Sequence, residues 1–181
     1  SKCRRRPRGV CGALRGAGGC SFGLVEVRRA QKADLIGIGR VADAGHWDAY
    51  SGLLGPAVIG ALLRRDFAPS ALRRRLLRGG VLVAVEGGVV VGFADAAVEG
   101  DRVRLRALGT DPERRHARVA ASLLGAVRGL APSLPVCADV LLGCIPVEGY
   151  LEAQGFVPGE VFDSSLFGEL AVERRWWLAP G

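Results

Sequence analysis

The pair Gly87–Gly88, in the middle of the chain, separates two runs rich in β-branched residues, Val81–Glu86 and Val89–Ala94. Glycine readily adopts the positive φ angles of a tight hairpin turn, so this pattern predicts two antiparallel strands. A second turn at 99–101 leads into 102–108, where apolar residues alternate with arginines as in a strand with one face in water. The sequence therefore predicts a three-stranded antiparallel meander, and the remaining elements must pack around it.

Elements of mixed type flank this meander. On the N-terminal side, an alternating segment predicts a strand, and the spacing of apolar residues and prolines predicts helices. The expected elements are a strand at 24–28, a helix from the N-cap Asp34 to Ala44, a loop from His46 to Pro56, a helix over Ala57–Leu63, and a short helix capped by Ser70 that runs to Leu77.

After the meander the pattern changes to alternating helices and strands. Asp111 is expected to end the third strand and to open a helix, which ends before Pro132. The apolar run 136–142 is typical of a strand buried on both faces, and a helix from Pro146 to Gly155 follows it. A last strand is expected over 170–178. This order predicts an α/β fold with a mixed sheet, in which the antiparallel meander is followed by a parallel strand-helix-strand-helix unit.

The charge of the chain is concentrated at one end. The net charge is +7, and residues 1–22 hold six basic residues and no acidic one, which leaves about +1 for the rest. We expect 1–22 to be a disordered basic tail, with a transit peptide as the alternative, and 24–181 to form the domain. Because the body is nearly neutral, nucleic-acid binding is ranked last, as a property that only the tail could carry.

Other classes of protein are disfavoured by composition. No apolar run approaches the length of about 18 residues that crosses a bilayer, so no membrane partner is expected. The five cysteines are odd in number and unclustered, which predicts neither a metal site nor a disulfide framework and favours a reducing, cytoplasmic location.

Two segments carry a resemblance to a known family. The run 108–120, LGTDPERRHARVA, resembles the strand end and R-x-x-G-x-G/A pyrophosphate loop of the GNAT (GCN5-related) N-acetyltransferases. The run 150–156, YLEAQGF, resembles the family's closing helix with its terminal Gly-Phe. The sequence departs from the family pattern at Arg118, where a glycine is usual, and at Cys144, where an asparagine is usual.

The resemblance implies acetyl-CoA as the acyl donor. The backbone of the strand end would bind the pantetheine arm as an added strand, and amides at the helix start would hold the diphosphate. The cofactor-binding residues implied in this way are Leu108, Thr110, Arg115, His116, Ala117, Arg118, Val119 and Ala120.

The resemblance also suggests where chemistry and acceptor binding would occur. Leu151 stands where the family frequently has a tyrosine acid, so the adjacent Tyr150 is the candidate acid, with a core aromatic as the alternative. Glu86 on the meander is the candidate base, with Asp95 and Glu99 as alternatives, and any of the three could instead be a solvated strand residue. Trp47 and Tyr50 lie where the family builds part of its acceptor pocket, and either could instead pack over the sheet.

The function implied is transfer of an acetyl group from acetyl-CoA to a primary amine by direct attack in a ternary complex. The acceptor could be a small molecule or a protein, and a homodimer is left open. The alternative is an acyl-CoA-binding module of the same fold that is weakly active or inactive, because the positions of Arg118, Cys144 and Leu151 depart from the family pattern.

Overall fold

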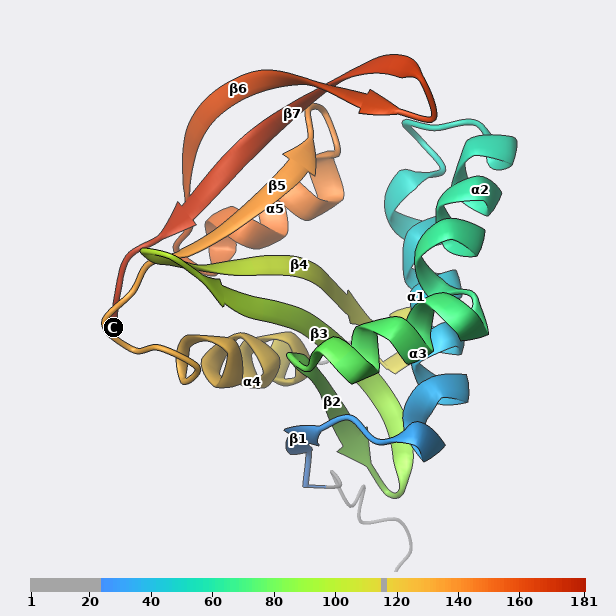
Figure 1. Cartoon of the computed structure of the whole chain (residues 1–181), viewed down its shortest axis with the longest axis vertical. Coiled ribbons are helices and arrows are strands. Elements are labelled where there is room, and N and C mark those ends of the chain that lie inside the picture. The colour runs from blue at the N-terminus through green and yellow to red at the C-terminus, as the bar shows by residue number, and fades with distance from the viewer. Residues whose placement is uncertain (1–23, 115–116) are drawn as a thin grey trace, which may run out of the picture.

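The computed structural model describes residues 24–114 and 117–181, and its centre is a seven-stranded mixed sheet in the order β1-β2-β3-β4-β5-β7-β6 (Figure 1). The strands are β1 (Glu26–Arg29), β2 (Val81–Glu86), β3 (Val89–Glu99), β4 (Arg102–Thr110), β5 (Val136–Leu141), β6 (Val157–Leu166) and β7 (Glu169–Leu178). The helices are η1 (Lys32–Asp34), α1 (Leu35–Tyr50), α2 (Pro56–Phe67), α3 (Pro69–Arg78), η2 (Pro112–Arg114), α4 (Ala117–Arg128) and α5 (Ile145–Ala153).

The predicted meander is confirmed. Strands β2, β3 and β4 pair antiparallel, and both glycines of the first turn have positive φ angles, 57° at Gly87 and 79° at Gly88. Strand β3 is longer than expected because it continues to Glu99 and carries a bulge at Asp95 and Ala96 opposite β4. The mixed α/β fold class is likewise confirmed, since β4 and β5 are parallel neighbours.

Two apolar cores cover the two faces of the sheet. Helices α1 and α3 pack with Val81, Val83 and Phe93 on one face. Helix α4 and residues of α5 pack with the alternate residues of the same strands, Leu82 among them, on the other face. Consecutive side chains of a strand point to opposite faces, so the near-continuous apolar runs of β2 and β3 follow from this double coverage.

Several predicted boundaries were wrong. Helix α1 runs through the expected loop to Tyr50, because the turn of His46 and Tyr50 stays half-buried against Phe67 and the sheet. Ser70 does not cap α3, since Pro69 already occupies its first turn and Ala68 is the N-cap. The helix expected from Asp111 is instead the short turn η2 followed by α4.

The prediction missed strand β6 altogether. Its side chains are mostly half-buried or exposed, and it contains Pro158 and Gly159, so its pattern lacks the clear alternation of a core strand. It pairs antiparallel with β7, and β7 in turn lies antiparallel beside β5. The second half of the sheet is therefore parallel only at the β4–β5 contact.

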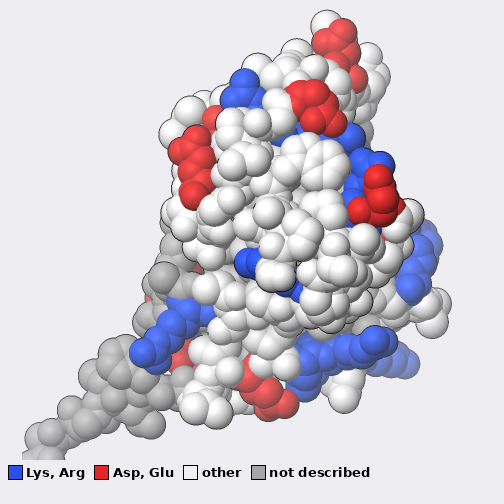
Figure 2. Space-filling model, turned by 90° about the vertical axis from the view of Figure 1, so that its left-hand side faces the viewer, with Lys and Arg blue, Asp and Glu red and all other residues white. Residues whose placement is uncertain are grey.

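The segment expected to be a disordered tail, residues 1–22, lies outside the described residues. Within the described part of the chain, no helix is long and apolar enough to span a membrane. On the face shown in Figure 2, basic and acidic side chains are interspersed around a broad area of uncharged residues.

Candidate functional site

The site begins where two parallel strands separate. Strands β4 and β5 are paired at Val103–Val136 and Arg104–Cys137, at their amino ends, and then diverge (Figure 1). Among the described residues no strand pairs with the edge of β4 that faces β5 beyond Arg104, so the backbone hydrogen-bonding groups of that edge are not used within the sheet. The sheet is thus open along 105–110.

A cavity of about 610 Å³ fills this opening. It is lined by β4 from Leu105 to Thr110 and by β5 from Ala138 to Leu141. Helices from both faces of the sheet also contribute, α1 and α2 on one side and α4 and α5 on the other. The volume falls in the range of small-molecule sites, about 300–1,000 Å³, and two substrates could enter from opposite faces and meet between the strands.

The end of β4 is bonded to helix α1 through Asp111. Asp111 is 4% exposed, and its carboxylate accepts a hydrogen bond from Arg40 of α1 at 2.5 Å and one from the Glu113 backbone N–H at 3.1 Å. The second Arg40 nitrogen donates to the Val90 carbonyl at 2.6 Å. Burial alone would raise the pKa of Asp111, but these hydrogen bonds and the charge of Arg40 lower it below its usual range. Asp111 therefore stays ionised and holds η2 at the end of β4.

The residues predicted to bind acetyl-CoA lie in different environments. Arg115 and His116 lie outside the described residues, and the Ala117 backbone begins α4. Arg118 is exposed in the first turn of α4, whereas Val119 is fully buried in the core. Ala120 is nearly buried and lines the cavity together with Leu108 and Thr110. A Cβ at Gly92 of β3 would lie 2.7 Å from the Val119 side chain, so the helix start is held close to the sheet.

Tyr150 is the predicted catalytic residue that the structure brings into the cavity. It lies on α5, lines the cavity, and its hydroxyl is buried without a hydrogen-bond partner among the described residues. Burial raises its pKa to about 12, so the phenol keeps its proton at neutral pH. The adjacent Leu151 is buried in the core while also touching the cavity. A buried hydroxyl without a partner is energetically costly, so this oxygen lowers the stability of the folded protein.

The predicted base is not in the cavity. Glu86 ends β2 beside the Gly87–Gly88 turn and is not among the lining residues. Of the two alternatives, Asp95 is 2% exposed and bonded to Arg75 at 2.5 Å, and Glu99 is bonded to Arg106 at 2.7 Å. Both alternative carboxylates are therefore already engaged in ion pairs.

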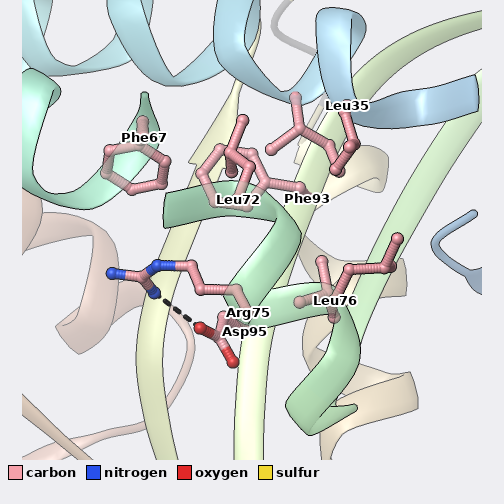
Figure 3. A pocket seen from close by; sticks show the side chains of 9 residues that line it. Leu35, Phe67, Leu72, Arg75, Leu76, Phe93 and Asp95 are labelled. Atoms are coloured by element: carbon pink, nitrogen blue, oxygen red, sulfur yellow. Dashed lines mark hydrogen bonds and ion pairs between the residues drawn. The ribbon is translucent and has the colours of Figure 1, made fainter. Parts of the chain in front are cut away.

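The Arg75–Asp95 pair closes a narrow void beneath α3 (Figure 3). The arginine extends from α3 past Phe67 and Leu72 and meets Asp95 on β3. The void holds only about 10 Å³, too little for a substrate, so this pair serves to fasten α3 to the sheet.

Of the two residues predicted to line the acceptor pocket, only one lies at the cavity. Tyr50 lines the cavity, and burial raises its pKa to about 12. Trp47 is 38% exposed and is not among the lining residues. The wall beside Tyr50 is built instead by His46, whose ring lies 5.4 Å from that of Tyr50 and 4.9 Å from that of Phe67. Burial lowers the pKa of His46, so its imidazole is neutral, and its Nδ1 lies 2.8 Å from the Ala42 carbonyl.

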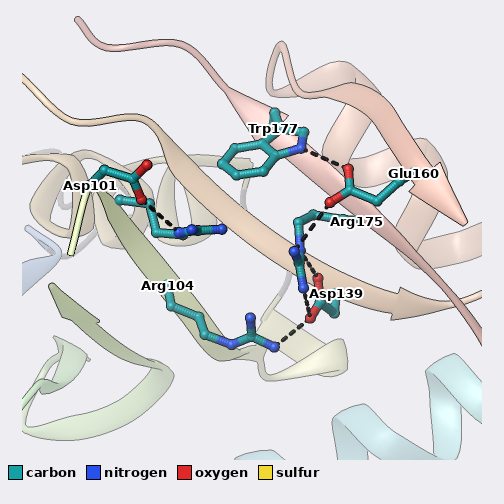
Figure 4. Close-up of polar contacts among 7 residues, drawn as sticks. Asp101, Arg104, Asp139, Glu160, Arg175 and Trp177 are labelled. Carbon is teal, nitrogen blue, oxygen red and sulfur yellow. Dashed lines mark hydrogen bonds and ion pairs between the residues drawn. The ribbon is translucent and has the colours of Figure 1, made fainter. Parts of the chain in front are cut away.

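Sequence reasoning missed the charged residues that β5 and β7 contribute. Asp139 of β5 binds Arg104 of β4 and is held by two nitrogens of Arg175 of β7 at 2.7 and 3.1 Å (Figure 4). Arg175 also reaches Glu160, which accepts a hydrogen bond from the Trp177 indole at 3.2 Å. This network joins the strands where they begin to separate. Its only sequence signal was a single acid inside an apolar strand.

The tip of the β6–β7 hairpin closes the far side of the cavity. Leu166 lines the cavity, and the guanidinium of Arg65 on α2 lies 5.1 Å from the centre of the Phe167 ring. Phe167 has a positive φ angle of 54°, which is uncommon outside glycine and allows this turn to form beside α2. Figure 1 shows the hairpin reaching from the second half of the sheet toward α2.

The acidic, histidine and cysteine side chains of the site are spread over several elements. No group of three or more His, Cys, Asp or Glu side chains within 24–114 and 117–181 is arranged to hold a metal ion.

The sequence matches no protein-family model and no curated protein. Solved structures do resemble the fold. The PaiA N-acetyltransferase from Thermoplasma acidophilum, determined in complex with coenzyme A, aligns with a TM-score of 0.70 and 19% identity over 83% of this chain and 98% of its own.

Two further structures show the same likeness. A GCN5-related N-acetyltransferase from Rhodopseudomonas palustris aligns with a TM-score of 0.71 and 18% identity, over 90% of this chain and 99% of its own. The ribosomal-protein-alanine N-acetyltransferase from Brucella melitensis aligns with a TM-score of 0.59 and 19% identity, over 85% and 99%. With its separated β4 and β5 strands and its mixed seven-stranded sheet, this chain has the fold of the GNAT N-acetyltransferases.

Proposed function

We propose that this chain is an acyl-CoA-dependent N-acetyltransferase that moves an acetyl group from acetyl-CoA to a primary amine. The observation that carries the proposal is the cavity between the separated strands β4 and β5, which is lined both by the unpaired edge of β4 and by Tyr150. The likeness of the fold to N-acetyltransferase structures, one of them holding coenzyme A, supports it.

The donor would enter from the side of α4 and α5. An amide-bearing pantetheine arm can pair with the open edge of β4 at Leu108 and Thr110 as an extra strand would. The start of α4 presents unpaired N–H groups and a partial positive charge toward a diphosphate, and the small side chain of Ala120 leaves room for it. The guanidinium of Arg118 is exposed in the same turn and could pair with a phosphate.

The acceptor would enter from the side of α1 and α2, past Tyr50 and His46. In a ternary complex the amine attacks the thioester carbonyl directly, the C–N bond forms, and the C–S bond breaks. Tyr150 is protonated at neutral pH and can donate a hydrogen bond to the sulfur as negative charge develops there, because its pKa is raised to about 12. Because no covalent enzyme intermediate is required, orientation supplies much of the rate enhancement.

Calorimetry with acetyl-CoA on the Arg118→Glu variant tests the donor site. Reversing the charge in the first turn of α4 should repel the diphosphate and weaken binding by about tenfold, which corresponds to about 1.4 kcal/mol. The control is Arg128→Glu, which makes the same charge change in the last turn of the same helix. Equal affinities in wild type and both variants would remove the start of α4 from the donor site.

The acceptor reaction needs a separate measurement. Release of free coenzyme A thiol is followed over a panel of primary amines with the wild-type protein. Binding of acetyl-CoA without transfer to any amine would favour the alternative of an inactive acyl-CoA-binding module.

A further inference from the structure

Among the described residues, four carboxylates line the cavity, and three of them already have partners. Asp66 is bonded to Arg65 at 2.7 Å, and Asp139 is held by Arg104 and Arg175. Asp48 also has an interaction partner. The fourth, Glu173 of β7, makes no hydrogen bond or ion pair with any residue of 24–114 and 117–181. An unpaired carboxylate in a half-buried site is costly unless a ligand completes it.

The strand register places Glu173 in the acceptor half of the cavity. Glu173 lies opposite Leu141, the last residue of β5, and two residues from Arg175 on the same strand. Alternate residues share a face, so Glu173 points to the same side of the sheet as Arg175 and its partner Asp139. Tyr50 and Arg65, which also line the cavity, lie close enough to Glu173 for its charge to act on both of them.

The charges around Glu173 come from four elements. Asp139 of β5 repels it, while Arg104 of β4, Arg175 of β7 and Arg65 of α2 attract it. Burial is the largest influence and, together with Asp139, raises the pKa of Glu173 above its usual range despite the three arginines. A carboxylate whose pKa is raised is a stronger base than an unperturbed one.

We infer that Glu173 binds the ammonium group of the acceptor and accepts its proton before attack. This inference rests on the proposed acetyltransferase function and adds to it the residue that selects and activates the amine. A cation is the ligand that an unpaired carboxylate recognises, and the ring of Tyr50 near Glu173 suits an alkylammonium.

Glu173, Tyr150 and the two substrates account for every proton that moves in the reaction. The acceptor arrives as R–NH₃⁺, Glu173 takes one proton, and the neutral amine forms the C–N bond to the acetyl carbon. When the C–S bond breaks, the thiolate takes up the second proton that the nitrogen loses, with the Tyr150 hydroxyl as the hydrogen-bonding group between them. Glu173 then releases its proton to solvent, so the net products are the acetamide, the coenzyme A thiol and one proton.

The binding step is tested by NMR on full-length protein labelled with ¹³C at the glutamate carboxyls and saturated with coenzyme A. The Glu173 signal is the one that disappears in Glu173→Gln. It is expected to titrate at higher pH than the other glutamates, and n-butylammonium chloride should lower its pKa, because a bound cation favours the carboxylate. Potassium chloride at equal ionic strength controls for screening.

The matched control is Glu169→Gln, at the exposed start of the same strand and outside the cavity. It should leave the Glu173 signal and its response to n-butylammonium unchanged. The inference is overturned if Glu173 titrates together with the exposed glutamates, or if n-butylammonium shifts it no more than potassium does.

The proton-accepting step is tested by transfer to n-butylamine. Glu173→Gln is expected to lose about 100-fold in rate and the acid limb of the pH profile, because an amide cannot take up a proton. A variant that retains the wild-type rate and profile would overturn this role.

Calorimetry with acetyl-CoA separates the inference from the proposed function. Glu173→Gln should bind acetyl-CoA as tightly as wild type, and a tenfold loss would mean that Glu173 acts on the donor, which overturns the inference. If the wild-type protein itself does not bind acetyl-CoA, the acetyltransferase proposal fails, while the same NMR titration without coenzyme A still decides whether Glu173 binds an ammonium.

Discussion

Replacing Tyr150 with phenylalanine should make the protein more stable and the proposed enzyme slower. The hydroxyl is buried without a partner among the described residues, while the ring packs against the core around α4 and α5. Phe keeps the ring and removes only the unsatisfied oxygen. An unsatisfied buried polar group costs about 1–3 kcal/mol, so the unfolding free energy should rise by an amount of that order.

Thermal unfolding measures the stability change. For a chain of this size a gain of 1 kcal/mol raises Tm by about 2–4 °C. The control is Tyr50→Phe, which removes the other cavity tyrosine's hydroxyl, an atom that is not among the buried groups lacking a partner. Tyr50→Phe should therefore give no comparable gain.

Coenzyme A release measures the activity change. If Tyr150 donates a hydrogen bond to the leaving sulfur, its loss should slow transfer by about 100-fold while acetyl-CoA affinity stays within a few-fold of wild type. A fall in Tm of more than about 2 °C would show that the hydroxyl is already satisfied in the folded protein. An unchanged transfer rate would show that it plays no part in the reaction.

Two further predictions concern the scaffold of the site. Gly92→Val should destabilise the protein by about 1–3 kcal/mol and weaken acetyl-CoA binding, because its Cβ would lie 2.7 Å from the Val119 side chain and push α4 from the sheet. Chemical denaturation measures the stability and calorimetry measures the binding. Wild-type values in both experiments would contradict the tight contact. Asp34→Asn should cost about 1–3 kcal/mol at pH 7, since Asp34 accepts two hydrogen bonds from Arg28 at 2.7 and 2.9 Å. These hydrogen bonds lower the pKa of Asp34, so its contribution to folding stability is present above the normal carboxyl pKa and is lost as pH falls through the lowered value. The unfolding free energies of wild type and variant should therefore converge at low pH. A constant difference at all pH values would be inconsistent with an ionised Asp34.

Much of the fold was accessible from the sequence because its signals are local. The Gly87–Gly88 turn, the β-branched runs around it and the apolar spacing of α4 each depend on residues a few positions apart. The errors occurred where a local signal was weak or was overridden. The first long helix was expected to end at Ala44, but α1 continues through Gly45 because the half-buried contacts of the next turn outweigh the cost of a helical glycine. Strand β6 was missed because its sequence lacks alternation.

The candidate site was less accessible. Tyr150 was identified through the family resemblance, and only the packing of α5 shows that this residue lines the cavity. Glu86 was chosen because it lies on the meander, yet it lies at a turn away from the opening. Glu173 gave no signal at all, since an acid in a strand of mixed polarity is usually solvated.

The sequence alone determined the meander, the helix that follows it and the mixed α/β class, because propensity and periodicity act over short stretches of chain. The tertiary structure decided where β4 and β5 separate, which carboxylates of the cavity are neutralised, and which one of them has no partner among the described residues. Asp139 meets Arg104 and Arg175 across 35 and 36 residues of sequence, and Arg40 meets Asp111 across 71. No local pattern encodes such distances, because they depend on the order in which strands assemble into the sheet.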